Sequence, residues 1–96
     1  MKSNSIWKYV LQPNIDIEMP VGAQILSVRE QGNDICMWTL VSPDAPKEKR
    51  IFMVFGTGHD VPPVQMKFLG TAHLQSGGLV FHVFELEQSS LVDISE

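Results

Sequence analysis

Short strand-like segments separated by turn residues are the feature that most constrains this chain. A strand with one buried face alternates apolar and polar side chains, and residues 15–18 (IDIE) do so strictly. No stretch shows a comparable helical period. Strand signals of this kind cover residues 5–11, 15–18, 24–31, 34–42, 50–56, 67–74 and 79–86. The pattern predicts a mainly β fold, a small antiparallel meander of about six strands that forms a curled sheet, a sandwich or a partly open barrel, with little helix.

Two of the turns predict hairpins. Gly32-Asn33 separates residues 24–31 from 34–42, and both residues tolerate positive φ. Gly77-Gly78 would join the last two segments through a two-residue turn of the primed type, and a turn at Ser76-Gly77 would shift that register by one residue. The segments 34–42 and 50–56 are apolar on both faces. We therefore expect them to be central strands or to be covered by a second copy of the chain.

The chain of 96 residues is long enough for one domain, residues 1–96, in which residues 87–96 form an acidic tail. We expect this tail to be either a short helix or a docked arm. Cys36 is the only cysteine, which excludes an internal disulfide and is typical of a reducing compartment. Neither a secretory signal nor an apolar run of about 20 residues is found, so we expect a cytoplasmic protein with no membrane partner.

The balance of charge argues against general nucleic-acid binding. Seven basic and eleven acidic residues give a net charge of −4, whereas duplex binding draws on a basic excess. The densest basic cluster, residues 47–50 (KEKR), contains its own glutamate and is typical of a solvated hairpin tip.

Residues 56–60 (GTGHD) are the most conspicuous motif. They lack the lysine and the following helix of a phosphate-binding loop, since Pro62-Pro63 oppose regular helix. The pattern predicts a turn whose glycines supply positive φ and whose backbone N–H groups could face an anion. Neighbouring residues of an extended chain point apart, so His59 and Asp60 do not form a catalytic pair by adjacency.

No residue stands in a recognisable catalytic setting. The hydroxyl and thiol groups that could act as nucleophiles lack a nucleophile elbow or an activating neighbour in the sequence. These candidates are Cys36, Ser27, Thr57 and Thr71. We therefore expect no catalytic residue, no cofactor and no enzymatic activity.

His73 and His82 are the best metal-ligand candidates. A hairpin would place them on one face of neighbouring strands, but a metal site would need a third ligand such as His59. Because His82 alternates with Val80 and Phe84, a core or interface histidine is the favoured interpretation.

A small anionic ligand is a second kind of partner that the sequence allows. Basic residues within strands can clamp a phosphate, and the turn at 56–59 can add backbone N–H groups. The predicted ligand-binding residues are Arg29, Arg50, Lys8 and Lys67 with Gly56, Thr57, Gly58 and His59.

Several blocks resemble a family of short, uncharacterised proteins encoded by phages and prophages. The blocks are IWKYVL (6–11), IEMPVGAQILSV (17–28), CMWTLV (36–41), RIFMVFGTGH (50–59) and GTAHLQSGGLVFHVFE (70–85). The resemblance covers most of the chain and implies an accessory protein made in a bacterial host cell. It carries over no activity and no functional residue.

Three hypotheses follow. In the first, a non-enzymatic, homo-oligomeric protein counteracts host defence by sequestering a small anionic ligand such as a nucleotide immune signal. In the second, the protein is an inhibitor or adaptor that binds a host protein through a sheet edge or an acidic surface. The third, a metal- or thiol-dependent enzyme, would need a third ligand beside the two histidines or an activated Cys36.

Overall fold

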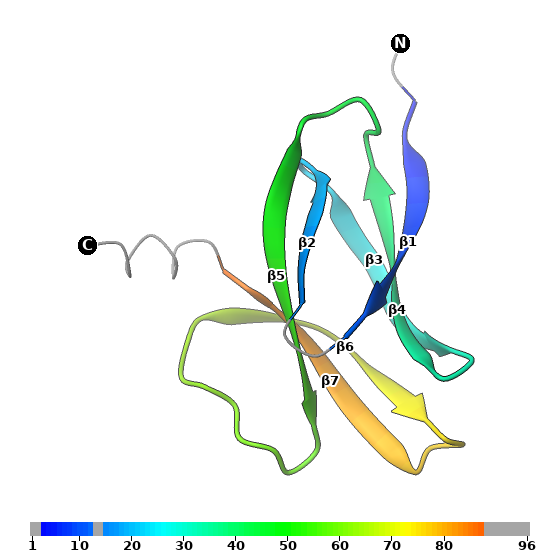
Figure 1. The fold of residues 1–96 in the computed structure, drawn as a ribbon, viewed down its shortest axis with the longest axis vertical. Helices are drawn as coiled ribbons and strands as arrows, with labels where there is room; N and C mark the ends of the chain where they lie inside the picture. Colours follow the sequence, from blue (N-terminus) through cyan, green and yellow to red (C-terminus); the bar gives the residue numbers. More distant parts are fainter. Residues whose placement is uncertain (1–2, 13–14, 88–96) are drawn as a thin grey trace.

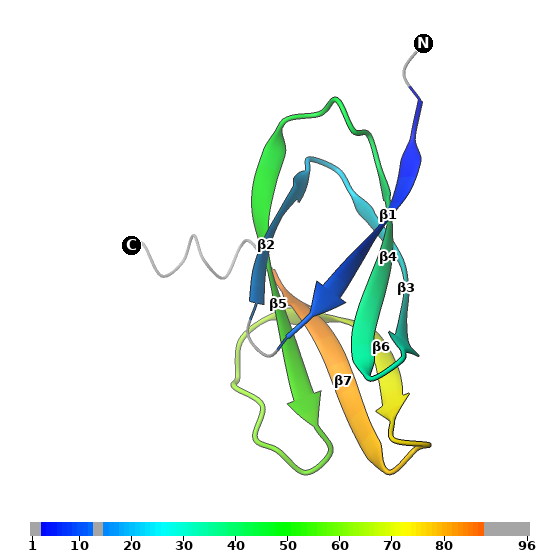
Figure 2. The same ribbon diagram turned by 45° about the vertical axis from the view of Figure 1, so that its right-hand side comes forward.

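The computed structural model describes residues 3–12 and 15–87, which form two antiparallel sheets. The sheet orders are β1-β4-β3 and β2-β5-β7-β6, and the two layers do not close into a barrel (Figures 1 and 2). The strands are β1 (Ser5–Leu11), β2 (Ile15–Pro20), β3 (Gln24–Gln31), β4 (Asp34–Val41), β5 (Lys47–Gly56), β6 (Met66–Leu74) and β7 (Leu79–Leu86). The predicted antiparallel β class is confirmed, and a sandwich is the form it takes.

The order of the strands differs from a continuous meander. Only β3–β4 and β6–β7 pair as consecutive strands, whereas β1 pairs with β4, and β5 pairs with both β2 and β7. β4 and β5 lie inside their sheets, as their two apolar faces predict. β1 and β2 lie at sheet edges.

The core fills the space between the sheets. On β4 the inward side chains Ile35, Met37, Thr39 and Val41 are all buried. The buried Thr39 keeps its hydroxyl satisfied, because Oγ1 donates to the carbonyl of Trp7 at 3.1 Å. The opposite sheet contributes further apolar side chains, of which a fully buried methionine, phenylalanine or valine stabilises the fold by about 1.5–3 kcal/mol. These are Met19, Phe52, Ala72 and Val83.

Both predicted hairpins are present, and one turn differs from the prediction. Gly32 has φ +62° in the two-residue turn between β3 and β4. In the second hairpin Leu74 pairs with Leu79, so four residues form the loop, and Gln75 and Ser76 have positive φ values of 51° and 55°. Gly77 N–H donates to the Leu74 carbonyl at 3.1 Å, which closes a primed turn centred on Gln75-Ser76 rather than on the glycines. The register is the one that the Ser76-Gly77 alternative implies.

The basic cluster at 47–50 is not a hairpin tip, which corrects the sequence-based interpretation. Its residues belong to β5 and pair with β2, with Lys47 opposite Pro20 and Lys49 opposite Glu18. Lys49 Nζ also lies 3.7 Å from Asp16 Oδ2, in an exposed ion pair worth at most about 1 kcal/mol. The acidic strand β2 therefore explains why basic residues extend β5.

Most of the acidic tail, residues 88–96, lies outside the described residues, so neither form predicted for it is tested. Among residues 3–12 and 15–87, no helix is long and apolar enough to cross a membrane.

The edge strands β3 and β6 meet where the two sheets come together. A Cβ atom on Gly70 would lie 3.0 Å from Val28 Cβ, so the strands approach as closely as a glycine allows. His73 N–H donates to Glu30 Oε1 at 3.3 Å across the same junction. The pKa of Glu30 is lowered by backbone N–H groups, first its own and then that of His73.

Candidate functional site

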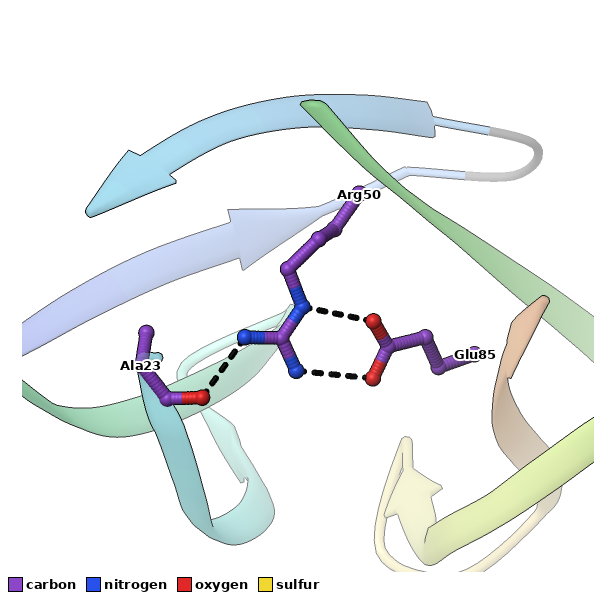
Figure 3. Close-up of polar contacts among 3 residues, drawn as sticks. All are labelled: Ala23, Arg50 and Glu85. Carbon is purple, nitrogen blue, oxygen red and sulfur yellow. Dashed lines mark hydrogen bonds and ion pairs between the residues drawn. The ribbon is translucent and has the colours of Figure 1, made fainter. Parts of the chain in front are cut away.

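A largely buried ion pair joins β5 and β7 within the four-stranded sheet, and one hydrogen bond links it to the residue that precedes β3 of the other sheet. Arg50 Nε and Nη2 donate to the two carboxylate oxygens of Glu85 at 2.6 and 2.8 Å, and Nη1 donates to the Ala23 carbonyl at 2.6 Å (Figure 3). Both side chains are 14% exposed. The hydrogen bonds to Glu85 raise the pKa of Arg50 above its already high value. The guanidinium therefore stays charged and fixed, in a bidentate geometry that favours carboxylate recognition.

Strand register explains this meeting. Arg50 lies opposite Ile17 on the inward face of β5, and Glu85 lies opposite the fully buried Phe52. An unpaired charge in a core is strongly unfavourable, so the two inward-facing side chains are stable there only as an ion pair. Ala23, just before β3, brings the third strand segment to the same point.

A pocket of about 500 Å³ opens beside the ion pair, between β3 and β6, and we call it the inter-sheet pocket. It brings together Arg50 and Lys67, two of the predicted ligand-binding residues. Arg50 uses three of its five N–H groups in these hydrogen bonds. The lining residues are Gly22, Ala23, Gln24, Ile25, Leu26, Arg50, Lys67, Phe68, Leu69 and Glu85. Two cations and one carboxylate leave this lining with a net positive charge.

A second cavity of about 270 Å³ lies where β5 ends, and we call it the aromatic cleft. Phe84 makes edge-to-face contacts with Phe55 and Phe68, with ring centroids 5.9 and 5.4 Å apart. The residues that line the cleft are Phe55, Gly56, Thr57, Gly58, His59, Val61, Phe68, His82 and Phe84. None of them is an aspartate, glutamate, lysine or arginine, so the lining is uncharged whenever its histidines are neutral.

The stretch at 56–59 is the turn that its glycines predict. His59 N–H donates to the Gly56 carbonyl at 3.0 Å, and Gly58 has φ +90°, which a type II turn requires at its third residue. Gly56 N–H donates to His59 Nδ1 at 3.3 Å, and Thr57 N–H donates to the Val80 carbonyl at 3.2 Å. Three of the four N–H groups are therefore used within the protein. Little is left of the anion-binding arrangement that the sequence allowed.

The two metal-ligand candidates lie on one face of the β6–β7 hairpin, as predicted, but diagonally rather than directly opposite each other. His73 pairs with Val80, whereas His82 pairs with Thr71. His82 Nε2 lies 2.8 Å from Thr57 Oγ1, and its Nδ1 lies 3.2 Å from Thr71 Oγ1, so hydroxyl groups occupy both ring nitrogens. Within residues 3–12 and 15–87 no three His, Cys, Asp or Glu side chains gather as a metal site.

The candidate nucleophiles differ in their surroundings. Thr57 and Thr71 contact His82, but with a hydroxyl at each nitrogen this imidazole has no carboxylate to orient it. Cys36 is only 1% exposed.

The predicted ligand-binding residues fall in three places. Arg50 and Lys67 line the inter-sheet pocket, and the residues from Gly56 to His59 line the aromatic cleft. Lys8 and Arg29 lie on the outer face of the three-stranded sheet, where Lys8 Nζ donates to Gln31 Oε1 at 2.7 Å. The structure therefore does not place these two cations at either cavity.

Sequence reasoning missed Glu85, Phe68 and Phe84. A signal existed for Glu85, because the alternation that turns Val83 and Phe81 inward also turns this carboxylate inward. No comparable signal marked the phenylalanines, since phenylalanine is equally common in strands whose side chains only pack in the core.

A family pattern described as a domain of unknown function (DUF7352) matches residues 2–92. The chain belongs to this family. The DUF7352 match spans all seven strands and both cavities, so the whole sandwich is the unit that defines the family. No significant similarity to a curated protein or to a solved structure was found.

Proposed function

We propose that this DUF7352 domain is a non-enzymatic binding protein that holds a small anionic ligand in the inter-sheet pocket. The observation that carries the proposal is the meeting of Arg50 and Lys67 in a pocket of about 500 Å³ on a chain whose net charge is −4. This volume falls within the roughly 300–1,000 Å³ that is typical of small-molecule sites. A locally positive pocket on an acidic protein selects for an anion.

Arg50 and Lys67 contribute to the proposed binding in different ways. Glu85 and the Ala23 carbonyl fix Arg50, so its guanidinium is oriented before a ligand arrives. Lys67 is exposed and, among the described residues, has no ion-pair partner, so it supplies the uncompensated charge. Each hydrogen bond to a charged group contributes about 1.5–3 kcal/mol, and a carboxylate or phosphate can accept several.

The resemblance to phage and prophage proteins suggests the biological setting. In this proposal the protein is an accessory protein in the cytoplasm of a bacterial host. It acts stoichiometrically and counteracts host defence by sequestering a nucleotide signal, whose phosphate is the anionic group. The support is the resemblance together with the charge and size of the pocket.

Calorimetry against cyclic and linear nucleotides tests the proposal, with Lys67→Met as the test variant and Lys8→Met as the matched control. Both variants lose one exposed lysine, but only Lys67 lines the pocket. We expect binding by the wild type, about tenfold or greater weakening in Lys67→Met, and no change in Lys8→Met. The absence of heat with every nucleotide would refute the proposal.

A second candidate, a protein-binding inhibitor or adaptor, is favoured by the outer face of the three-stranded sheet. Ile6 and Val10 of the edge strand β1 are 59% and 42% exposed there. An apolar edge strand can add a strand from a host protein or pair with a second copy, which would form the predicted homo-oligomer. Capture of one stoichiometric host protein, lost in an Ile6→Lys variant, would support this candidate. Light scattering distinguishes pairing between copies.

A further inference from the structure

The aromatic cleft has walls that suit a flat ring. Phe68 is 55% exposed although it packs edge-to-face on Phe84, so one large aromatic surface remains open beside a fixed partner. Phe55 continues the same row of rings through Phe84. Planar rings stack on such surfaces, and the stacking of one base on an aromatic side chain contributes about 1–3 kcal/mol.

His59 adds a polar group whose proton position the backbone determines. Its Nδ1 accepts the Gly56 N–H, so the neutral ring carries its own proton on Nε2 and is a hydrogen-bond donor there. A Cβ atom at Gly56 would lie 2.9 Å from His59 Cε1, so only a glycine leaves room for the imidazole in this position. The GTGH turn therefore positions one donor at the wall of the cleft.

The uncharged lining decides which group of a ligand enters. A phosphate or carboxylate finds no lysine or arginine in these walls to offset its loss of water, whereas a neutral ring loses little on leaving water. We propose that the aromatic cleft binds a planar heteroaromatic ring with a hydrogen-bond acceptor, of the nucleobase class. A volume of about 270 Å³ is large enough for one such ring.

Phe68 lines both the aromatic cleft and the inter-sheet pocket. A ring in the cleft and an anionic group beside Lys67 would then belong to one nucleotide that reaches around the β6 edge. Only this last step rests on the proposed function. Ring binding by the cleft stands on the geometry of the cleft itself.

Nuclear magnetic resonance titrations with adenosine, indole and inorganic phosphate separate the two sites. Adenosine carries ring acceptors and no charge, indole is a ring without an acceptor nitrogen, and phosphate has no ring. We expect adenosine to shift the signals of Phe68, His59 and His82, and phosphate to shift those around Lys67 instead. Phe68→Ala should weaken adenosine binding about tenfold, and Leu79→Ala, which removes an exposed apolar side chain outside the cleft, should leave it unchanged.

Each outcome has a distinct meaning. Adenosine binding at the cleft without any phosphate binding supports this inference and removes the proposed anion site. Phosphate binding without adenosine shifts at Phe68 overturns this inference and leaves the anion site intact. Equal affinity for indole and adenosine overturns the requirement for an acceptor. A Gly56→Ala variant, which must displace His59, should lose the preference for adenosine over indole and keep the fold.

Discussion

Replacing Arg50 with methionine tests how strongly the buried Arg50–Glu85 ion pair and the hydrogen bond to Ala23 stabilise the fold. Methionine keeps most of the apolar stem and removes the guanidinium, with its three hydrogen bonds and its position over the Phe52 ring. Glu85 is left unpaired at 14% exposure. Breaking a buried pair costs about 3–5 kcal/mol, and the remaining exposure places this one at the lower end, near 3 kcal/mol. A chain of 96 residues has a free energy of unfolding of about 5–14 kcal/mol, so the loss would be large.

Urea denaturation followed by the fluorescence of Trp7 and Trp38 measures this loss. With a slope of about 1–3 kcal/mol per molar urea, the midpoint should fall by about 1–3 M. Lys49→Met, which breaks the exposed pair with Asp16, is the matched control and should cost at most about 1 kcal/mol. The double variant Arg50→Met/Glu85→Leu should lose clearly less than the two single changes together. Equal losses in Arg50→Met and Lys49→Met, or strict additivity in the double variant, would refute the reasoning.

Three further predictions address other parts of the sandwich. Gly70→Ala places a Cβ atom 3.0 Å from Val28 Cβ, so we expect the free energy of unfolding to fall by about 1–3 kcal/mol. Calorimetry should show a Tm lower by at least about 4 °C. An unchanged Tm would contradict the close approach of β3 and β6. The lowered pKa of Glu30 means that its carboxylate stabilises the fold above its ordinary value of 4.5 and that this contribution is lost as the pH falls through the lowered value. Urea midpoints of wild type and Glu30→Gln should therefore differ at neutral pH and converge as the pH falls below 4.5, and a constant difference would contradict this. Cys36 is 1% exposed, so it should react with a thiol reagent at least about a thousandfold more slowly in native buffer than in urea. Rapid labelling of the native protein would contradict this and show that β4 opens easily.

The strands and their faces could be predicted because alternation is a local property. Ile15 and Ile17 face the core while Asp16 and Glu18 face outward, as the pattern of β2 predicts. The Gly32-Asn33 turn could be predicted equally well, since a two-residue loop between two alternating segments fixes the register of the two strands that it joins.

The pairing of distant strands could not be predicted in the same way. β1 pairs with β4 and β2 pairs with β5 because apolar faces from both halves of the chain close over one core, and no local pattern specifies which edges meet. The start of β5 at Lys47 has the same origin, because its pairing with the acidic β2 decides the strand's length. The loop at 75–78 shows that a primed turn can use Gln75 and Ser76 when the register of Leu74 and Leu79 requires it.

The structure shows separate roles for the two glycines of GTGHD, which the sequence alone does not distinguish. Read alone, Gly56 and Gly58 suggest a chain that turns or a backbone that faces an anion. In the fold they have separate tasks, since Gly58 allows the turn with its positive φ and Gly56 makes room for the His59 ring. The imidazole in return accepts the Gly56 N–H, which removes that group from any ligand. A motif that resembles a phosphate-binding turn thus lines an uncharged cleft. The positive charge lies on the other side of the β6 edge, where Lys67 and Arg50 line the inter-sheet pocket.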